Sequence, residues 1–202
     1  MSNAAQQLDR EVEILIAAER TFSRFGYSRA SMEGIAEEAG LSRAGLYTYF
    51  SRKEALFKAV VRRLHEQTLE EAAEIAERQG LSIDDRLVGM FEARVGFFVD
   101  RFHGLEQAQE LFTESSRQCA DVLVDARRGY RRMLTRVLRD ADRAGEIRLR
   151  QNGLTAAGAA ELIARAVEGL KAGSDEPLSP KAFHDRLAVL LGLLVRGLAP
   201  GQ

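Results

Sequence analysis

The chain contains no tryptophan, a single cysteine and only three prolines in 202 residues. Because one cysteine cannot form an internal disulfide, Cys119 excludes a fold that such a bond stabilises. The prolines stand at positions 177, 180 and 200, so residues 1–176 contain none. Proline breaks helix interiors, and its absence leaves most of the chain free to form long helices.

Targeting signals and membrane spans are also missing from the sequence. The N-terminus lacks the charged region and following apolar region that mark a secretory signal. The apolar stretch Leu187–Leu198 is too short to cross a bilayer and carries Arg196. We therefore expect a cytoplasmic globular protein. The leader Met1-Ser2-Asn3-Ala4 is typical of an expression scar and enters no argument.

A strong basic excess is absent as well, since the formal net charge is -1. The charge is nevertheless uneven along the chain. Residues 1–63 carry 10 Lys and Arg against 8 Asp and Glu (+2), and residues 64–202 carry 19 against 22 (-3). Any contact with nucleic acid must therefore come from a basic face within the N-terminal part.

Helical periodicity is what the sequence does contain. Apolar residues recur three and four positions apart throughout, and no segment alternates with period two, so we expect an all-α fold. Glycines at 26, 40, 80, 104, 145, 153 and 173 mark helix ends. The expected helices, about nine, are 9–25, 31–39, 42–50, 51–79, 82–100, 105–115, 119–144, 154–171 and 180–198. The run Gly173–Pro177 separates the last two.

The segment Ser31–Glu54 has the pattern of a helix-turn-helix, with Ser31 and Ser42 as N-caps and Ser51 capping the helix that follows. In the first helix, the positions expected to face a small core are Val12, Ile16, Ala17, Phe22 and Phe25. The inner surface of the motif is expected to consist of Ile35, Ala36, Ala39, Leu41, Leu46 and Phe50.

The outward residues of the motif have the chemistry that a DNA major groove requires. The expected DNA-binding residues are Ser31, Arg43, Ala44, Gly45, Tyr47, Thr48, Tyr49 and Lys53. Ser31, Tyr47, Tyr49 and Lys53 suit phosphate oxygens. Arg43 can pair with guanine or hold a phosphate, and both roles stay open. Thr48 can touch a thymine methyl group or a phosphate, and Gly45 permits close approach of the backbone.

Taken together, these residues resemble the TetR family of transcriptional regulators. The matching positions are Phe22–Gly26, Ser31, Ile35-Ala36, Ala39-Gly40-Leu41-Ser42, Gly45-Leu46-Tyr47, Tyr49-Phe50 and Lys53-Glu54-Ala55-Leu56. The resemblance implies a DNA-binding domain at 9–63 and a helical effector-binding and dimerisation domain at 64–202. It also implies a homodimer that binds double-stranded operator DNA.

Two positions depart from the family pattern. Ala44-Gly45 stands where the family often has glycine followed by threonine, which removes a hydroxyl group from the expected DNA face. Gly34 lies inside the second helix, where glycine costs about 1 kcal/mol relative to alanine. We expect that helix to become firmer on DNA.

In the second part of the chain, Arg94 shares a helical stripe with Leu87, Phe91 and Phe98. An arginine within an apolar stripe needs a partner, and two explanations stay open. One is a carboxylate or other anion of a ligand. The other is an internal pair with Glu110 or Glu114, or a side chain that reaches water.

A pocket for a small hydrophobic or amphipathic effector is expected where these faces converge. Its expected lining consists of His65, Phe91, Arg94, Phe98, Phe112, Tyr130 and Met133. The alternative is a filled core with one satisfied histidine.

The last helix is apolar nearly all the way round, which a single buried face does not explain. Together with the preceding helix, it predicts a four-helix seam across a two-fold axis. The expected interface residues are Ile163, Ala166, Leu170, Leu187, Leu191 and Leu194. The alternative is a helix enclosed within its own protomer.

An enzyme and a helical adaptor for other proteins are the competing classes. The sequence has no G-x-S-x-G, P-loop, Rossmann glycine pattern or H-E-x-x-H, and its histidines at 65, 103 and 184 are dispersed. Asp100 with His103 is a weak metal site by itself. An adaptor would not need Tyr47, Tyr49 and Lys53 exposed together. We therefore expect a non-enzymatic repressor that needs no cofactor or metal and leaves its near-palindromic operator when an effector binds.

Overall fold

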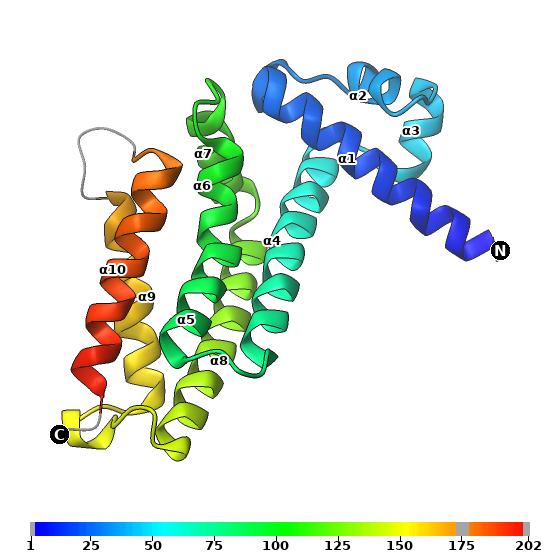
Figure 1. Ribbon diagram of the computed structural model, residues 1–202. Helices are drawn as coiled ribbons and strands as arrows, with labels where there is room; N and C mark the ends of the chain where they lie inside the picture. The colour runs from blue at the N-terminus through cyan, green and yellow to red at the C-terminus, as the bar shows by residue number, and fades with distance from the viewer. Residues whose placement is uncertain (1–2, 173–177, 200–202) are drawn as a thin grey trace. The chain divides into compact units, whose positions relative to one another are not determined.

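The computed structural model describes residues 3–172 and 178–199, and every regular element in those ranges is helical (Figure 1). The helices are α1 (Asn3–Arg29), α2 (Met32–Glu38), α3 (Arg43–Tyr49), α4 (Lys53–Glu77), α5 (Ile83–Phe91), α6 (Phe97–Phe102), α7 (Ala108–Gln118), α8 (Ala120–Ala144), α9 (Ala156–Ala172) and α10 (Pro180–Leu198). The all-α prediction is confirmed. The predicted breaker run Gly173–Pro177 lies outside the described residues.

Helices α5 and α6 are joined by a π-helical segment, Glu92–Gly96, so the two read as one helix in the expected place. The start of α4 differs from the prediction, because its first backbone bond runs from the amide of Leu56 to the carbonyl of Arg52. Arg52, and not Ser51, therefore occupies the cap position. A short 3-10 turn, Arg150–Asn152, precedes α9.

The chain forms two compact units, which are described separately below. The first contains residues up to Glu66 together with Gly104–Val124, and the second contains Gln67–His103 and the residues from Asp125 onward. Helices α4 and α8 each contribute to both units.

In the first unit, α1 buries one face formed by Ile14, Ala18 and Phe22. The sequence prediction for this face was partly wrong, because Val12 and Phe25 are exposed. Val12 lies on the other side of α1 from Ile14, since two residues advance a helix by about 200°. Phe25 stands in the last turn before a backbone break at Gly26, where the Arg24 guanidinium lies 5.0 Å from its ring centre.

Three aromatic rings of the first unit pack together around the end of α1. Phe57 from α4 meets Phe22 edge to face at 5.1 Å and Tyr27 at 4.9 Å. Edge-to-face contacts of this kind stabilise a core beyond the area that they bury. Gly26 makes this arrangement possible because its φ of 78° and ψ of 169° turn the chain sharply between Phe22 and Tyr27.

In the second unit, α9 and α10 run side by side in opposite directions (Figure 1), and α10 also packs on α5. The centre of this core includes Phe91, Leu134, Phe183, Leu187 and Leu191, which are all buried. Pro180 occupies the first turn of α10 behind the N-cap Ser179, a position where its missing amide proton costs nothing. No helix within the described ranges is long and apolar enough to cross a membrane.

Candidate nucleic-acid interface

The N-termini of α2 and α3 are fixed by matching serine caps. The Ser31 hydroxyl accepts the amide of Gly34 at 3.0 Å, and the Ser42 hydroxyl accepts the amide of Gly45 at 3.0 Å. Each bond satisfies one of the amides that a helix start leaves without an internal partner. Both caps confirm the positions predicted from sequence.

A glycine turn sets the direction in which α3 leaves α2. The amide of Gly40 donates to Glu37 O at 3.0 Å and that of Leu41 to Ala36 O at 2.8 Å, which is the Schellman pattern of helix ends. Gly40 adopts the left-handed φ of 62° that this pattern requires. From α1, Arg10 donates to the carbonyls of Ala39 and Gly40 at 3.2 and 3.3 Å, so the turn is also held from outside.

The inner side of α3 is anchored by one residue, since Leu46 is completely buried. Ile35 and Ala36 of α2 and Phe50 after α3 complete the inner surface, as predicted. Ala39 and Leu41, also predicted there, are half-buried. With this side fixed, the opposite side of α3 faces outward.

The outward side of α3 carries Arg43, Ala44, Tyr47 and Thr48, all exposed, whereas Tyr49 is half-buried. The Arg43 guanidinium lies 5.8 Å from the Tyr47 ring centre, so the two side chains form a shared surface one turn apart. The Thr48 hydroxyl donates to Gly45 O at 2.7 Å. Its proton is therefore engaged within α3, which leaves the oxygen lone pairs and the methyl group facing outward.

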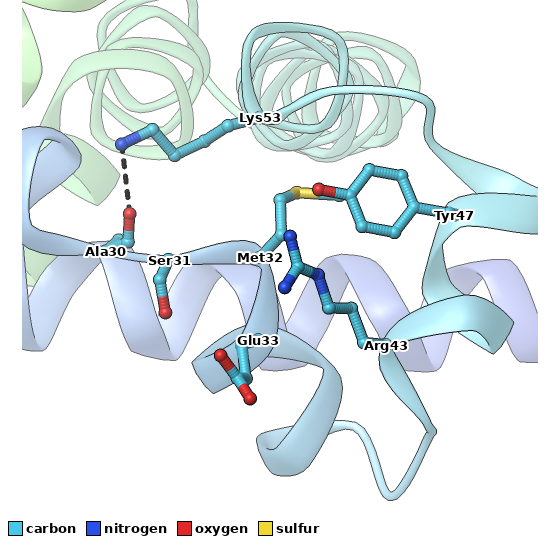
Figure 2. Close-up of a pocket in the computed structure, with 7 residues that line it drawn as sticks. All are labelled: Ala30, Ser31, Met32, Glu33, Arg43, Tyr47 and Lys53. Atoms are coloured by element: carbon cyan, nitrogen blue, oxygen red, sulfur yellow. Dashed lines mark hydrogen bonds between the residues drawn. The ribbon is translucent and has the colours of Figure 1, made fainter.

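Figure 2 shows an open hollow between the start of α2 and the outward side of α3. Arg43 and Tyr47 line one side of it, and Ser31 and Lys53 line the other. The remaining lining residues are Ala30, Met32 and Glu33. The hollow thus brings together half of the residues predicted to bind DNA. It contains two cationic side chains against one carboxylate, which favours an anionic partner.

Lys53 has a different environment from the free phosphate-binding side chain that the sequence suggested. Its ammonium group donates to the carbonyls of Tyr27 at 2.8 Å, Ala30 at 2.9 Å and Ser28 at 3.4 Å. It also lies 4.5 Å from the Tyr27 ring centre. Since an ammonium has three protons, these carbonyls account for all of them.

The residues predicted to line an effector pocket are divided between the two units. His65 and Phe112 belong to the first, and Phe112 is exposed. Phe91, Arg94, Phe98, Tyr130 and Met133 belong to the second. Within the second unit, Phe91 meets Tyr130 edge to face at 5.3 Å, and the Arg94 guanidinium lies 5.8 Å from the Phe98 ring centre.

Glu110 and Glu114, which the sequence suggests as possible partners of Arg94, form hydrogen bonds with other groups. Glu110 accepts the backbone amide of Ser28 at 2.8 Å, and hydrogen bonds with Ser28 hold the pKa of Glu110 below its usual value. Glu114 accepts hydrogen bonds from Arg117 and Gln118. Both glutamates therefore bond to groups of the first unit, whereas Arg94 belongs to the second.

The residues predicted for the dimer seam fall on both sides of α9 and α10. Ile163, Leu187 and Leu191 are buried in the core of their own protomer, with exposed fractions of 3%, 0% and 0%. Ala166, Leu170 and Leu194 are half-buried. The large apolar side chains that are exposed on these helices are instead Leu162, Val189 and Leu193.

The sequence did not predict the contacts that Arg10 and Glu110 make with backbone groups of residues 28–40. Both reach across a long sequence separation to backbone groups, 29 residues for Arg10 to Ala39 and 82 for Glu110 to Ser28. Backbone partners leave no residue-type signal, so only the fold reveals them. Gly26 offered one indirect signal, because a side chain there would overlap the Glu110 carboxylate.

A capped helix-turn-helix is typical of a class of DNA-binding proteins. In this class the second helix of the motif lies in the major groove. The sequence pattern of the family described as "Bacterial regulatory proteins, tetR family" matches residues 14–60. The transcriptional regulator UidR of Escherichia coli (strain K12) is 31% identical over 136 residues, which are 66% of this chain and 67% of UidR. The chain belongs to the TetR family.

Two further comparisons agree with this family. YfiR of Bacillus subtilis (strain 168), an HTH-type transcriptional regulator, is 36% identical over 72 residues; this match spans 36% of the chain and only 35% of YfiR. The fold is similar to the crystal structure of a protein from Mesorhizobium loti MAFF303099 that is described as a TetR-family transcriptional regulator. That comparison has a TM-score of 0.76 and 16% identity, over 99% of this chain and 100% of the other. The YfiR match agrees with the family over about a third of each chain, and the crystal structure shows a shared fold.

Proposed function

We propose that the protein is a homodimeric transcriptional repressor that binds near-palindromic operator DNA in the cytoplasm and leaves it when a small effector binds. The observation that carries the proposal is the outward side of α3. Arg43 and Tyr47 project there from a helix whose start is capped by Ser42 and whose inner side is anchored by Leu46. A helix fixed on one side and polar on the other is suited to reading a groove.

In this proposal residues 9–63 bind DNA, and the eight predicted residues divide by their chemistry. Arg43 contacts a base edge or a phosphate, and Thr48 offers its methyl group to thymine. The exposed N-terminus of α2 behind Ser31, together with Tyr47 and Tyr49, contacts phosphates. Ala44 and Gly45 allow the helix backbone to approach the groove. Lys53 supports this surface from behind through its bonds to backbone carbonyls and makes no phosphate contact of its own.

Residues 64–202 form the dimer and sense the effector in this proposal. The face of α9 and α10 that carries Leu162, Val189 and Leu193 packs on the same face of a second copy around a two-fold axis. Val189 and Leu193 lie one turn apart on α10, and a contiguous exposed apolar patch marks an interaction surface. Ala166, Leu170 and Leu194 flank the seam.

The effector acts by changing the spacing of the two recognition helices, which must match successive major grooves about 34 Å apart. Moving such an equilibrium from almost wholly binding-competent to almost wholly incompetent takes roughly 5.5 kcal/mol of differential ligand affinity. By linkage, operator DNA weakens effector binding by the same factor.

Selection of binding sites from random duplexes with the purified protein tests the proposal. The expected result is a two-fold symmetric sequence whose half-sites are centred about 10 base pairs apart or at a multiple of that spacing. Small molecules are then screened for release of the selected duplex, and a released complex is titrated for reciprocity. Enrichment of no sequence over the starting pool would contradict DNA recognition.

A further inference from the structure

Arg94 is a cation to which no described residue of the second unit supplies a counter-charge. It lies in the π-helical segment Glu92–Gly96 and is largely shielded from water. Within the described ranges, its only contact of a specific kind is the 5.8 Å approach to the Phe98 ring, and no carboxylate pairs with it. Burial lowers the pKa of the guanidinium, and Tyr130 opposes this effect.

Tyr130, on α8, places a second unsatisfied polar group beside Arg94. Its hydroxyl is buried and has no hydrogen-bond partner among the described residues. Phe91, three residues before Arg94, packs edge to face on the Tyr130 ring at 5.3 Å, so Tyr130 lies near Arg94. Burial raises the pKa of Tyr130, and the charge of Arg94 opposes that rise. At neutral pH the hydroxyl is therefore a neutral donor next to a cation.

Each of these groups is unfavourable in the folded protein by itself. A buried hydroxyl without a partner loses the hydrogen bonds that it makes in water, and a shielded charge without a counter-ion is more unfavourable still. Arg127 adds a further positive charge, which also lowers the pKa of Arg94. Arg127 is exposed, so water screens its charge, and among the described residues Arg94 and the Tyr130 hydroxyl are donors without an acceptor. Such a site is complementary to an anion.

The backbone that carries Arg94 is itself unusual and is held in place. π-Helical segments inside α-helices occur frequently at functional sites. Gly96 leaves room for the His184 ring, because a β-carbon at Gly96 would come 2.8 Å from His184 Cε1. His184 in turn bonds Glu92 and Asp100, at 3.3 and 2.9 Å. His184 thus holds the π-helical segment against α10, whereas no carboxylate in the described ranges pairs with Arg94.

We propose that Arg94 and Tyr130 bind the carboxylate of a small organic acid with an apolar body. The carboxylate accepts from the guanidinium through two oxygens and from the Tyr130 hydroxyl, which satisfies both groups at once. This inference rests on the proposed function, since it names the chemical class of the effector for the second unit.

A monoanion fits this site better than a phosphate dianion. One carboxylate neutralises the shielded guanidinium, whereas a dianion would leave a charge uncompensated away from water. The aromatic rings beside Arg94 and Tyr130 favour a ligand with an apolar body. Phe91 packs on Tyr130 at 5.3 Å, and Phe98 lies against Arg94.

Calorimetric titration of the full-length protein without DNA tests this inference. The probes are two acids, benzoate and octanoate, and two uncharged matches, benzyl alcohol and 1-octanol. We expect at least one acid to bind and its alcohol to bind about 10-fold or more weakly. Arg94→Met should weaken acid binding about 10- to 100-fold and leave alcohol binding unchanged. Tyr130→Phe, which removes only the hydroxyl, should weaken acid binding by a smaller factor.

The matched control is Arg128→Met, which removes an exposed arginine of α8 that pairs with Asp125 at 3.0 Å. It should leave acid binding unchanged. Failure of both acids to bind the wild type, equal binding of acid and alcohol, or full acid binding by Tyr130→Phe would each overturn the inference. If Arg94→Met does not fold, Tyr130→Phe alone decides. DNA affinity of the same samples is measured separately, so a failed inference with intact operator binding leaves the proposed function standing.

Discussion

The Lys53 ammonium donates to the carbonyl of Ala30 at 2.9 Å, and this bond joins the start of α4 to the chain just before α2. The carbonyl of Tyr27 accepts from the same ammonium at 2.8 Å. These carbonyls belong to the end of α1 and the link to α2, where backbone acceptors lack helical partners. Lys53 therefore fastens the segment that positions Ser31 and α2.

Lys53→Met should lower the free energy of unfolding of the protein by about 1–3 kcal/mol, because it removes charged hydrogen bonds to partly buried carbonyls. DNA affinity should also fall, because the segment that positions Ser31 and α2 becomes less ordered. The slope of log affinity against log salt should stay unchanged, because no phosphate contact disappears. Thermal unfolding and anisotropy at several salt concentrations measure these two quantities.

A salt slope that decreases by about one unit with unchanged unfolding would instead assign Lys53 to a phosphate. Arg52→Met, at the neighbouring exposed position, controls for loss of one positive charge at the start of α4.

Arg43→Ala should weaken binding to the selected operator by about 1–3 kcal/mol and relax one operator position, if Arg43 reads a base. Arg43→Lys keeps the charge but loses the two-pronged geometry, so it should lose the same preference while retaining most of the salt slope. Anisotropy with the operator and with random duplexes separates the two effects. Equal losses on both kinds of DNA would show that Arg43 holds a phosphate.

Gly26→Ala should destabilise the protein more than Gly40→Ala. Both glycines have positive φ, 78° and 62°. A β-carbon at Gly40 meets nothing within 4 Å, whereas one at Gly26 overlaps the Glu110 carboxylate. A left-handed φ costs about 1–2 kcal/mol for alanine at Gly40. Gly26, with ψ of 169°, lies in a region that essentially only glycine adopts, and the overlap adds to that strain. Urea unfolding compares them, and equal losses would remove the role given to the Glu110 contact with Ser28.

His184 should make the second unit more stable at acidic than at basic pH. Only the imidazolium can donate to Asp100 and Glu92 together. Burial lowers the pKa of His184, but the two carboxylates outweigh it and the pKa is raised. On its own helix, Lys181 and Asp185 pair with each other. The stabilisation is therefore complete below the unfolded pKa of about 6.5 and is lost as pH rises through the folded value.

His184→Gln accordingly should cost about 1 kcal/mol near pH 5.5 and much less near pH 9. Thermal unfolding of both proteins across this range gives the difference. A loss that is constant with pH would mean that the ring acts by packing against Gly96 and not by its charge.

Val189→Glu and Leu193→Glu should convert the proposed dimer to a monomer, because each places a carboxylate in the centre of an apolar seam. Each side chain is exposed in the protomer, at 61% and 57%, so the fold itself should persist. Val124→Glu, at a similarly exposed apolar position on α8, is the matched control. Mass measured by light scattering decides, and unchanged dimers in both variants would exclude this face.

The helices and the helix-turn-helix were predictable because local signals specify them. Ser31 and Ser42 are N-caps, Gly40 ends α2, and the spacing of Ile35, Ala36 and Leu46 defines an inner face. These signals act within a few residues and do not depend on the rest of the fold.

The environments of Lys53 and Arg94 and the sides of α9 and α10 were not predictable in the same way. Lys53 binds backbone carbonyls of a segment more than 20 residues away, which no residue type reveals. In α10 nearly every position is apolar, so periodicity could not separate the buried Leu187 and Leu191 from the exposed Val189 and Leu193. The burial of Arg94 likewise depends on its neighbours in space.

Binding of the full chain to its selected duplex and to a scrambled duplex of the same composition tests the central claim most directly. At about 0.15 M salt, fluorescence anisotropy should give an affinity for the selected site at least about 1,000-fold higher than for the scrambled one. Arg43→Ala should reduce that ratio. Equal affinity for the two duplexes would contradict the assignment of this chain as a sequence-specific regulator.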